Sequence, residues 1–319
     1  MPPEDSGRTD LAERVLAGDA RAVSRAISVV EREDAASAAL IGRLFARSGR
    51  ALVVGLTGAP GVGKSTLADR VTAAYRRERL RVGVLAVDPT SPFSGGAILG
   101  DRIRMQGHAA DDGVFVRSMA TRGQLGGLAR ATDDARIVLD AAGTDVVLIE
   151  TVGVGQGEID VSRTADVSVV VLAPGSGDDV QAIKAGIMEI GDVFVVNKAD
   201  RDGADRAVAE IEGMLSLRER GTDEWRPPVI RTRAATGDGV DDVVAAVRRF
   251  AGRGPVAGDR ARRRARARLE SILIGRLVER IGAERGLDGV VDAIVAREVD
   301  PYTAAGDLVR RFVLEAPGS

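Results

Sequence analysis

The sequence contains no cysteine and only one histidine, His108. The absence of cysteine excludes disulfide bonds, thiol catalysis, iron–sulfur clusters and cysteine-ligated zinc. A single histidine also excludes a histidine-rich metal site. No apolar run approaches the ~18 residues that a membrane-spanning helix needs, and the acidic, polar start of the chain is unlike a signal peptide. We therefore expect a soluble, cytoplasmic protein.

Lysine and asparagine are scarce as well. Lys64, Lys184 and Lys198 are the three lysines among 45 basic residues, and Asn197 is the one asparagine. Lysine and arginine differ in shape, hydration and donor geometry, so a chain that uses arginine almost everywhere has a reason wherever it keeps a lysine. These four residues are therefore candidates for functional positions.

Neither sign of charge dominates. The 45 basic residues oppose 47 acidic ones, which leaves a net charge of −2 at pH 7 and no general attraction to nucleic acid or anionic membranes. Residues 259–268 are rich in arginine, but alanines separate the arginines and no aromatic residue is present to stack on bases. We interpret this segment as a solvated helix face, and expect neither a nucleic-acid nor a membrane partner.

Short, valine-rich runs alternate with amphipathic helices from residue 51 onward. The runs do not alternate with polar residues, which is typical of strands that are buried on both faces of a parallel sheet. The pattern predicts an α/β fold with a doubly wound, mostly parallel sheet. The expected strands are 51–58, 81–88, 144–150, 167–174, 193–198 and 227–232, and the helices between them include 65–79, 179–190, 203–219 and 239–250.

Helices are expected at both ends of the chain. Residues 10–46 have helical periodicity with a break at Gly18-Asp19, and the segment AGRGPVAGD (251–259) is interpreted as a linker rich in glycine and proline. A helix with one apolar stripe follows it. The predicted division is an N-terminal helical extension (1–48), a nucleotide-binding domain (49–252) and a C-terminal helical region (253–319), and the stripe comprises Leu269, Ile272, Leu273, Leu277, Val278 and Ile281.

The segment GAPGVGKST fits the phosphate-binding pattern G-x-x-x-x-G-K-[ST] and stands between an apolar strand and a helix. Its glycines let backbone N–H groups approach phosphate oxygens, and the helix N-terminus adds a partial positive charge. Lys64 would reach the β- and γ-phosphates, and the Ser65 hydroxyl would bind Mg²⁺. The predicted nucleotide-binding residues are Gly58, Ala59, Pro60, Gly61, Val62, Gly63, Lys64, Ser65 and Thr66.

The tetrapeptide Asn197-Lys198-Ala199-Asp200 fits the N-K-x-D element of GTP-binding proteins. The Asp200 carboxylate can accept hydrogen bonds from the N1–H and 2-amino groups of guanine, whereas adenine offers no such donor pair. The Lys198 stem can lie along the base, and Asn197 can bridge to the phosphate loop. Downstream, Arg233, Ala234 and Ala235 follow a predicted strand and could supply backbone contacts to the base.

Several acidic residues stand where a magnesium ion and mobile switch loops would need them. Asp88 and Glu150 end predicted strands and would lie at the carboxyl edge of the sheet, where either could bind Mg²⁺ or a water of its shell. Asp101 lies in a loop long enough to cover the nucleotide. The Gly153 N–H could contact the γ-phosphate and lose that contact on hydrolysis.

With these residues in place, the chain resembles the methylmalonyl-CoA mutase-associated GTPases of the SIMIBI class, which are often labelled arginine/ornithine transport kinases. The resemblance covers nearly the whole chain. It is carried by GAPGVGKST (58–66), VDPTSPFSGGAILGDRIRM (87–105), RSMATRGQLGGLA (117–129), ETVGVGQGE (150–158), PGSGDDVQAIKAGIMEIGDVFVVNKAD (174–200) and DPYTAA (300–305).

The resemblance implies a function beyond the motifs themselves. Its members hydrolyse GTP in the presence of Mg²⁺, act as chaperones for adenosylcobalamin-dependent acyl-CoA mutases, and form homodimers through a C-terminal helical arm. It implies catalytic roles for Lys64, Asp101, Glu150 and Gly153, with Asp101 and Glu150 in the first two switches. Residues 178–184 match a third switch. The family usually has Ser-Ala at the base-contacting turn, where this chain has Arg233-Ala234.

Two other functions compete with this interpretation. A GTP-driven metal-insertion protein would need several histidine or cysteine ligands, and this chain has one histidine and no cysteine. A kinase that uses the same phosphate loop is disfavoured because Asp200 selects guanine over adenine. Gln156 and Glu158 could orient the attacking water, but neither stands where such a residue is expected, so no catalytic base is assigned.

Overall fold

The computed structural model describes residues 10–88, 106–108, 110–120, 127–151, 164–175, 188–217, 225–283 and 286–310. Within the chain, two compact units are distinguished, residues 1–262 and 263–319. The three-part division expected from the sequence stays a prediction.

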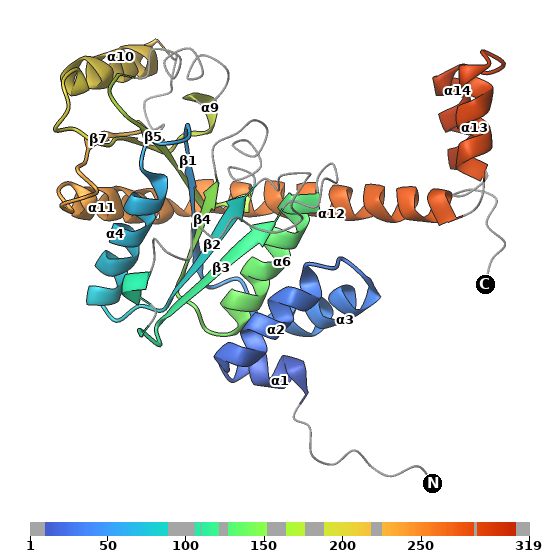
Figure 1. The fold of residues 1–319 in the computed structure, drawn as a ribbon, viewed down its shortest axis with the longest axis horizontal. Coiled ribbons are helices and arrows are strands. Elements are labelled where there is room, and N and C mark those ends of the chain that lie inside the picture. The colour runs from blue at the N-terminus through green and yellow to red at the C-terminus, as the bar shows by residue number, and fades with distance from the viewer. Residues whose placement is uncertain are drawn as a thin grey trace, which may run out of the picture. The chain divides into compact units, whose positions relative to one another are not determined.

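A seven-stranded, fully parallel sheet in the order β3-β2-β4-β1-β5-β6-β7 forms the centre of the first unit (Figure 1). This confirms the α/β, doubly wound fold. The strand order reverses around β1, which has β4 on one side and β5 on the other, and ligands of such sheets bind at this point beyond the carboxyl ends of the strands. The strands are β1 (Leu52–Thr57), β2 (Val82–Asp88), β3 (Val114–Ala120), β4 (Val146–Thr151), β5 (Val167–Leu172), β6 (Val193–Val196) and β7 (Val229–Arg231).

Strand β3 was not predicted from the sequence. This strand pairs only with β2 and forms one edge of the sheet. Phe115 packs toward one face and Val116 toward the other, but Arg117 and Ser118 interrupt the apolar run, and residues 113–118 are only partly buried. An edge strand of this kind lacks the continuous valine pattern by which the central strands were recognised.

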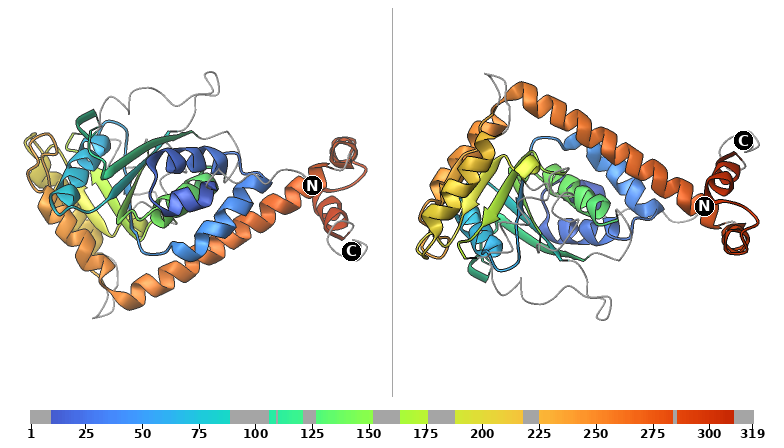
Figure 2. Two further views of the ribbon diagram at one scale, coloured as in Figure 1. Left: turned by 90° about the horizontal axis from the view of Figure 1, so that it is seen from below. Right: turned by 90° about the horizontal axis from the view of Figure 1, so that it is seen from above.

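Helices cover both faces of the sheet (Figures 1 and 2). On one face, Val54 and Leu56 of β1 pack with α4 (Lys64–Arg77) and α11 (Val240–Ala251). On the other face, Val53 packs with the N-terminal helices and α6 (Gly127–Ala141), and α10 (Ala204–Ser216) covers β5 and β6. Two short elements, η2 (Gln106–His108) and α9 (Met188–Ile190), complete the described part of the sheet region.

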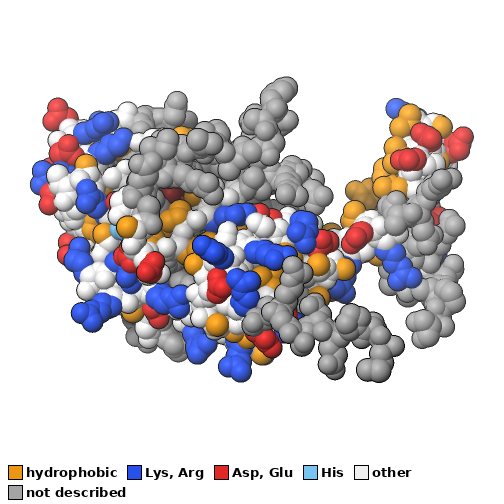
Figure 3. All heavy atoms as spheres, turned by 60° about the horizontal axis from the view of Figure 1, so that its bottom comes forward, with side chains coloured by type: hydrophobic (Ala, Val, Ile, Leu, Met, Phe, Trp, Pro, Cys, Tyr) orange, Lys and Arg blue, Asp and Glu red, His pale blue; other side chains and the backbone are white. Residues whose placement is uncertain are grey.

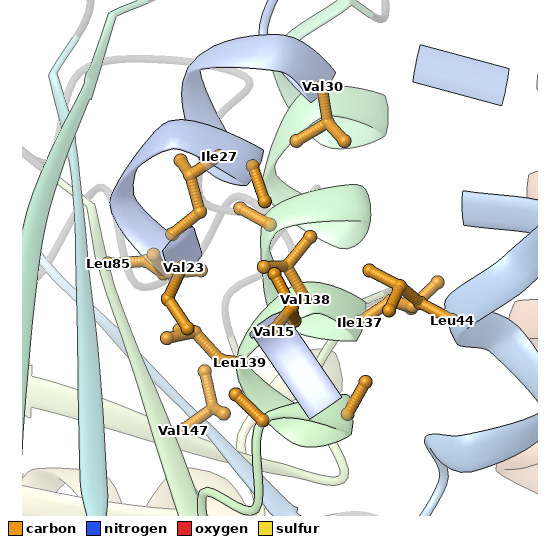
Figure 4. Close-up of a cluster of buried hydrophobic side chains, with 14 of the residues drawn as sticks. Val15, Val23, Ile27, Val30, Leu44, Leu85, Ile137, Val138, Leu139 and Val147 are labelled. Atoms are coloured by element: carbon orange, nitrogen blue, oxygen red, sulfur yellow. The ribbon is translucent and has the colours of Figure 1, made fainter. Parts of the chain in front are cut away.

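The N-terminal helices are part of this core. They are α1 (Leu11–Leu16), α2 (Ala20–Val30) and α3 (Ala35–Leu44), followed by the short turn η1 (Phe45–Arg47). The predicted break lies between α1 and α2, where Gly18 has φ +78° and Asp19 caps α2 by accepting from Arg21 N and Ala22 N. Val23 and Ile27 of α2 point into a cluster formed with α6 and the sheet (Figure 4).

The segment interpreted as a linker is largely helical, which corrects the sequence analysis. Only Gly252 and Arg253 separate α11 from α12 (Gly254–Ala283). Pro255 stands in the first turn of α12, where its missing N–H has no helical partner to lose. Alanine and arginine, which dominate the following residues, are strong helix formers. The long α12 is visible in both views of Figure 2.

The second unit comprises the later part of α12 together with α13 (Gly286–Val295) and α14 (Pro301–Val309). Large apolar side chains of these helices are exposed, and orange side chains gather on the C-terminal helices in Figure 3. The exposed large apolar residues of the second unit include Leu269, Leu273, Ile274, Val278, Val291, Val295 and Tyr302. In the described part of the chain, no helix has the length and apolar character required to span a membrane.

We predict that Ile27→Ala destabilises the first unit by about 2–5 kcal/mol, because it empties space in a packed core. Ile27 of α2 is fully buried against α6 and the sheet. Leu217→Ala is the control, since Leu217 is 83% exposed and its truncation should change stability by less than about 0.5 kcal/mol. Urea unfolding followed by circular dichroism measures both; equal effects would show that the N-terminal helices are not integral to the core.

Candidate nucleotide-binding site

The predicted phosphate loop connects the carboxyl end of β1 to the start of α4. Gly63 is the N-cap residue of α4 and has φ +97°, in the left-handed region that favours glycine. Among the described residues, the backbone N–H groups of Gly61, Val62 and Gly63 have no protein acceptor. Such N–H groups at a helix N-terminus form a binding site for anionic oxygens.

Two of the loop glycines are required by close contacts. A Cβ at Gly58, which has φ +139°, would collide with the carbonyl oxygen of Val171 on β5. A Cβ at Gly63 would collide with the side-chain amide of Asn197. The loop therefore packs directly against β5 and against the residue that follows β6.

Lys64 lies inside the loop. Its side chain is buried, and Nζ donates to the carbonyl oxygens of Gly58 at 2.5 Å and Ala59 at 2.8 Å. These bonds hold a positive charge beside the N–H groups of the loop. The arrangement suits a ligand with several negative charges, such as a di- or triphosphate.

Ser65 and Glu150 meet beside the loop. Ser65 Oγ donates to Glu150 Oε1 at 2.5 Å, and Glu150 is buried near the carboxyl end of β4, with β1 and β2 on either side. A hydroxyl and a carboxylate are oxygen ligands of the kind that Mg²⁺ prefers. Sequence reasoning had assigned each to the metal separately, and the structure brings the two together. Among described residues, no group of three or more His, Cys, Asp or Glu side chains is placed to bind a metal ion.

The other predicted switch and metal residues cannot be placed in the same way. The backbone of Asp88 ends β2, next to β4 at the carboxyl edge of the sheet, but its side chain is not among those described. Asp101, Gly153, Gln156, Glu158 and residues 178–184 lie outside the described residues. Their predicted roles stay predictions.

Asn197 connects the phosphate loop to the turn that follows β7. Its side chain is buried, and Nδ2 donates to Val62 O at 2.9 Å. On the opposite side, Oδ1 accepts from Thr232 Oγ1 and from Ala234 N, both at 3.0 Å. The bridge to the phosphate loop that the sequence predicted is therefore present, and Asn197 also binds the second predicted base-contacting segment.

Lys198 and Asp200 extend beyond Asn197 at the carboxyl end of β6. Lys198 has φ +57°, and its Nζ donates to Gly61 O at 2.6 Å, so its stem crosses the space next to the phosphate loop. The Asp200 side chain is exposed. No described residue is hydrogen-bonded to it or forms an ion pair with it, so it is open to a ligand.

The turn Arg233–Ala235 presents fewer contacts than the sequence suggested. Arg233 N donates to Asp238 O, and the Arg233 side chain pairs with the Asp238 carboxylate. Ala234 N donates to Asn197. Among described residues, only the Ala235 N–H of these three amides has no acceptor, so it is the one available to a base.

Sequence reasoning also missed Arg70 of α4. Its guanidinium donates from Nε to Ala234 O at 3.1 Å and from Nη2 to Ala235 O at 2.8 Å. No sequence pattern distinguishes Arg70 from the other arginines, because its partners lie more than 160 residues away.

The model of the family described as "Methylmalonyl Co-A mutase-associated GTPase MeaB" matches residues 23–285. The chain belongs to the MeaB family. A Pyrococcus horikoshii relative named as a GTPase is 46% identical over 310 residues, which cover 95% of this chain and 98% of the relative. The GTPase ArgK of Escherichia coli is 39% identical over 237 residues, 72% of each chain. This MeaB-family protein is thus a GTPase that binds guanine nucleotides.

Two further relatives carry different names. The mitochondrial methylmalonic aciduria type A homolog of Mus musculus is 41% identical over 214 residues, which cover 66% of this chain and 52% of the mouse protein. A crystal structure described as a LAO/AO transport system kinase has a TM-score of 0.67 and 28% identity, and covers 94% of this MeaB-family chain and 96% of its own. Both agree with the resemblance found in the sequence.

We predict that Gly63→Ala weakens GDP binding about tenfold or more relative to Gly61→Ala. Both glycines have positive φ, so both alanines strain the backbone. Only the Cβ at position 63 would collide with Asn197, whereas nothing lies within 4 Å of a Cβ at position 61. Titration calorimetry with GDP measures the difference, and equal losses would mean that the contact with Asn197 is unimportant.

Proposed function

We propose that this GTPase binds GTP and Mg²⁺ at the described site and acts as a chaperone that assembles, protects or reactivates an adenosylcobalamin-dependent acyl-CoA mutase, such as methylmalonyl-CoA mutase. Membership of the MeaB family, whose model names an association with that mutase, carries the proposal. The name of the mouse relative supports the same physiological context.

In this proposal the phosphate loop and Lys64 hold the triphosphate. Ser65 and Glu150, with Asp88 and Asp101 as further candidates, would bind Mg²⁺, which neutralises charge on the phosphate oxygens during phosphoryl transfer. Lys64 would stabilise the same charge directly, and Gly153 would contact the γ-phosphate. Asp200 and the Ala235 N–H would select guanine. The nearby Ser65–Glu150 hydrogen bond supports the metal assignment because two oxygen ligands already converge there.

The cobalamin itself is expected on a separate protein. The sequence has no D-x-H-x-x-G cobalamin-binding element, since its only histidine, His108, is preceded two residues earlier by Gln106. A chaperone without its own cobalamin must act through contact with the mutase chain.

The partner proposal predicts that the purified protein binds a cognate acyl-CoA mutase, and that the mutase changes its rate of GTP hydrolysis. Co-purification in the presence of a non-hydrolysable GTP analogue, GDP or no nucleotide measures the first, and phosphate release measures the second. Lys64→Ala, which removes the phosphate-loop charge, is the control that should lose nucleotide dependence. No complex and unaltered turnover with every cognate mutase would contradict the proposal.

We further propose a homodimer formed through the C-terminal helices. Leu273 and Ile274 of α12 are 57% and 64% exposed, which is unusual for large apolar side chains on one helix. Burial of this surface against a second copy would remove it from water. The exposed apolar residues of α13 and α14 would enlarge the same interface.

We predict that the double substitution Leu273→Arg, Leu277→Arg yields a monomer that still binds GTP. The control is Glu279→Arg, because at about 100° per residue position 279 points about 140° away from the midpoint between positions 273 and 277. Multi-angle light scattering measures the mass of each variant. A dimeric mass for the double variant would refute this interface.

A further inference from the structure

Arg70 connects the helix of the phosphate loop to the turn that faces the base. It lies on α4, six residues after Lys64, and its two hydrogen bonds reach the consecutive carbonyl oxygens of Ala234 and Ala235 at 3.1 and 2.8 Å. A planar guanidinium can make two such bonds in a fixed geometry, which a lysine ammonium cannot do.

The first of these bonds fixes the peptide group that joins Ala234 and Ala235. The carbonyl of Ala234 and the N–H of Ala235 belong to one planar peptide unit and point in opposite directions when the bond is trans. The described residues include no cis peptide bond. Arg70 therefore determines the direction of the Ala235 N–H, the amide for which the described residues supply no acceptor.

The turn is held from its other side by Asn197. Asn197 Oδ1 accepts from Ala234 N, while Arg70 donates to Ala234 O, so both polar groups of Ala234 have partners from elements next to the phosphate loop. Arg233 is held separately by Asp238. Among the polar groups of described residues that are predicted to contact the base, this leaves the Ala235 N–H and the exposed Asp200 carboxylate without a protein partner.

We propose that Arg70 is a positioning residue for guanine specificity, which directs the Ala235 N–H toward the 6-oxo group of the base. This inference rests on the proposed role of the Arg233–Ala235 turn in base binding. The N–H donor suits the oxygen acceptor of guanine and opposes the 6-amino donor of adenine. Asp200 reads the neighbouring groups on the same edge of the base, the N1–H and 2-amino groups. The positive charge of Arg70 also polarises the peptide unit and strengthens its N–H as a donor.

The test compares nucleotides that differ at one position of the base. 6-Thio-GDP keeps the N1–H and 2-amino groups of GDP but replaces the 6-oxo group with sulfur, a weak acceptor. IDP keeps the 6-oxo group and lacks the 2-amino group. The ratio of Kd values for 6-thio-GDP and GDP therefore reports on the Ala235 N–H, and the ratio for IDP and GDP reports on Asp200.

Arg70→Ala is expected to reduce the preference for GDP over 6-thio-GDP by about 3- to 10-fold, the contribution of one hydrogen bond, and to leave the IDP ratio unchanged. Arg70→Lys keeps the positive charge but cannot make both hydrogen bonds in the fixed geometry of a guanidinium, so it should give an intermediate preference. Arg77→Ala is the matched control, because Arg77 is an exposed arginine of the same helix whose partner is Asp241. It should change neither ratio. Titration calorimetry with Mg²⁺ measures each Kd.

The outcomes separate this inference from the proposed site. Asp200→Asn should reduce the IDP ratio and favour xanthine nucleotides, whatever Arg70 does. An unchanged thio ratio in Arg70→Ala, or an equal loss in both ratios, would overturn the role of Arg70 while the base site stands. If the wild-type protein shows neither preference and Asp200→Asn has no effect, the proposed base site fails and this inference fails with it. Ratios within one variant do not depend on its stability, so a weakened fold does not obscure the result.

Discussion

The buried side chain of Asn197 is the contact on which the geometry of the site depends. Its amide nitrogen binds the carbonyl of Val62, and its amide oxygen binds Thr232 and Ala234. A carboxylate at this position could not donate to Val62, and a longer amide would not fit against Gly63, whose missing side chain makes room for it. One residue therefore joins three segments that are distant in the sequence, and a buried group of this kind is costly to leave unpaired.

Hydrogen bonds connect the phosphate-binding loop and the predicted base-binding segments into one unit. Asn197 and Lys198 bind the phosphate loop from the end of β6, and Arg70 reaches from α4 to the turn after β7. A nucleotide whose phosphates and base contact these segments would meet groups already held in place, which lowers the ordering cost of binding. Specificity for the base and affinity for the phosphates would then depend on the same hydrogen bonds.

Site residues could be predicted from the sequence when the residues of one site lie close together in the chain, and not when their partners lie far away in the chain. Gly58–Ser65 and Asn197–Asp200 were recognised because each motif is contiguous and a whole chemical role falls within a few residues. Arg70 was missed because it binds backbone carbonyl groups in a remote turn. Every residue has such a carbonyl, so no residue type in the sequence indicates this contact. The helical start of α12 was misinterpreted because Pro255 usually signals a break, although in the first turn of a helix it is tolerated. Asp101 and Gly153 remain identified by motif alone.

The missed strand β3 shows that a pattern can fail for a structural reason. Arg117, which interrupts its apolar run, donates to Glu31 Oε2 at 2.7 Å and to Ser28 Oγ at 3.0 Å on the N-terminal helical side. Both partners of the Arg117–Glu31 ion pair are about four-fifths buried, so the pair is largely shielded from solvent, unlike a surface salt bridge. Arg130 at the start of α6 pairs in the same way with Glu33, a residue held at φ +55°. Arg117 thus interrupts the apolar pattern of β3 in the sequence and also attaches this strand to α2. The N-terminal helices thus contact the edge strand through Arg117 and share a hydrophobic core with one face of the sheet.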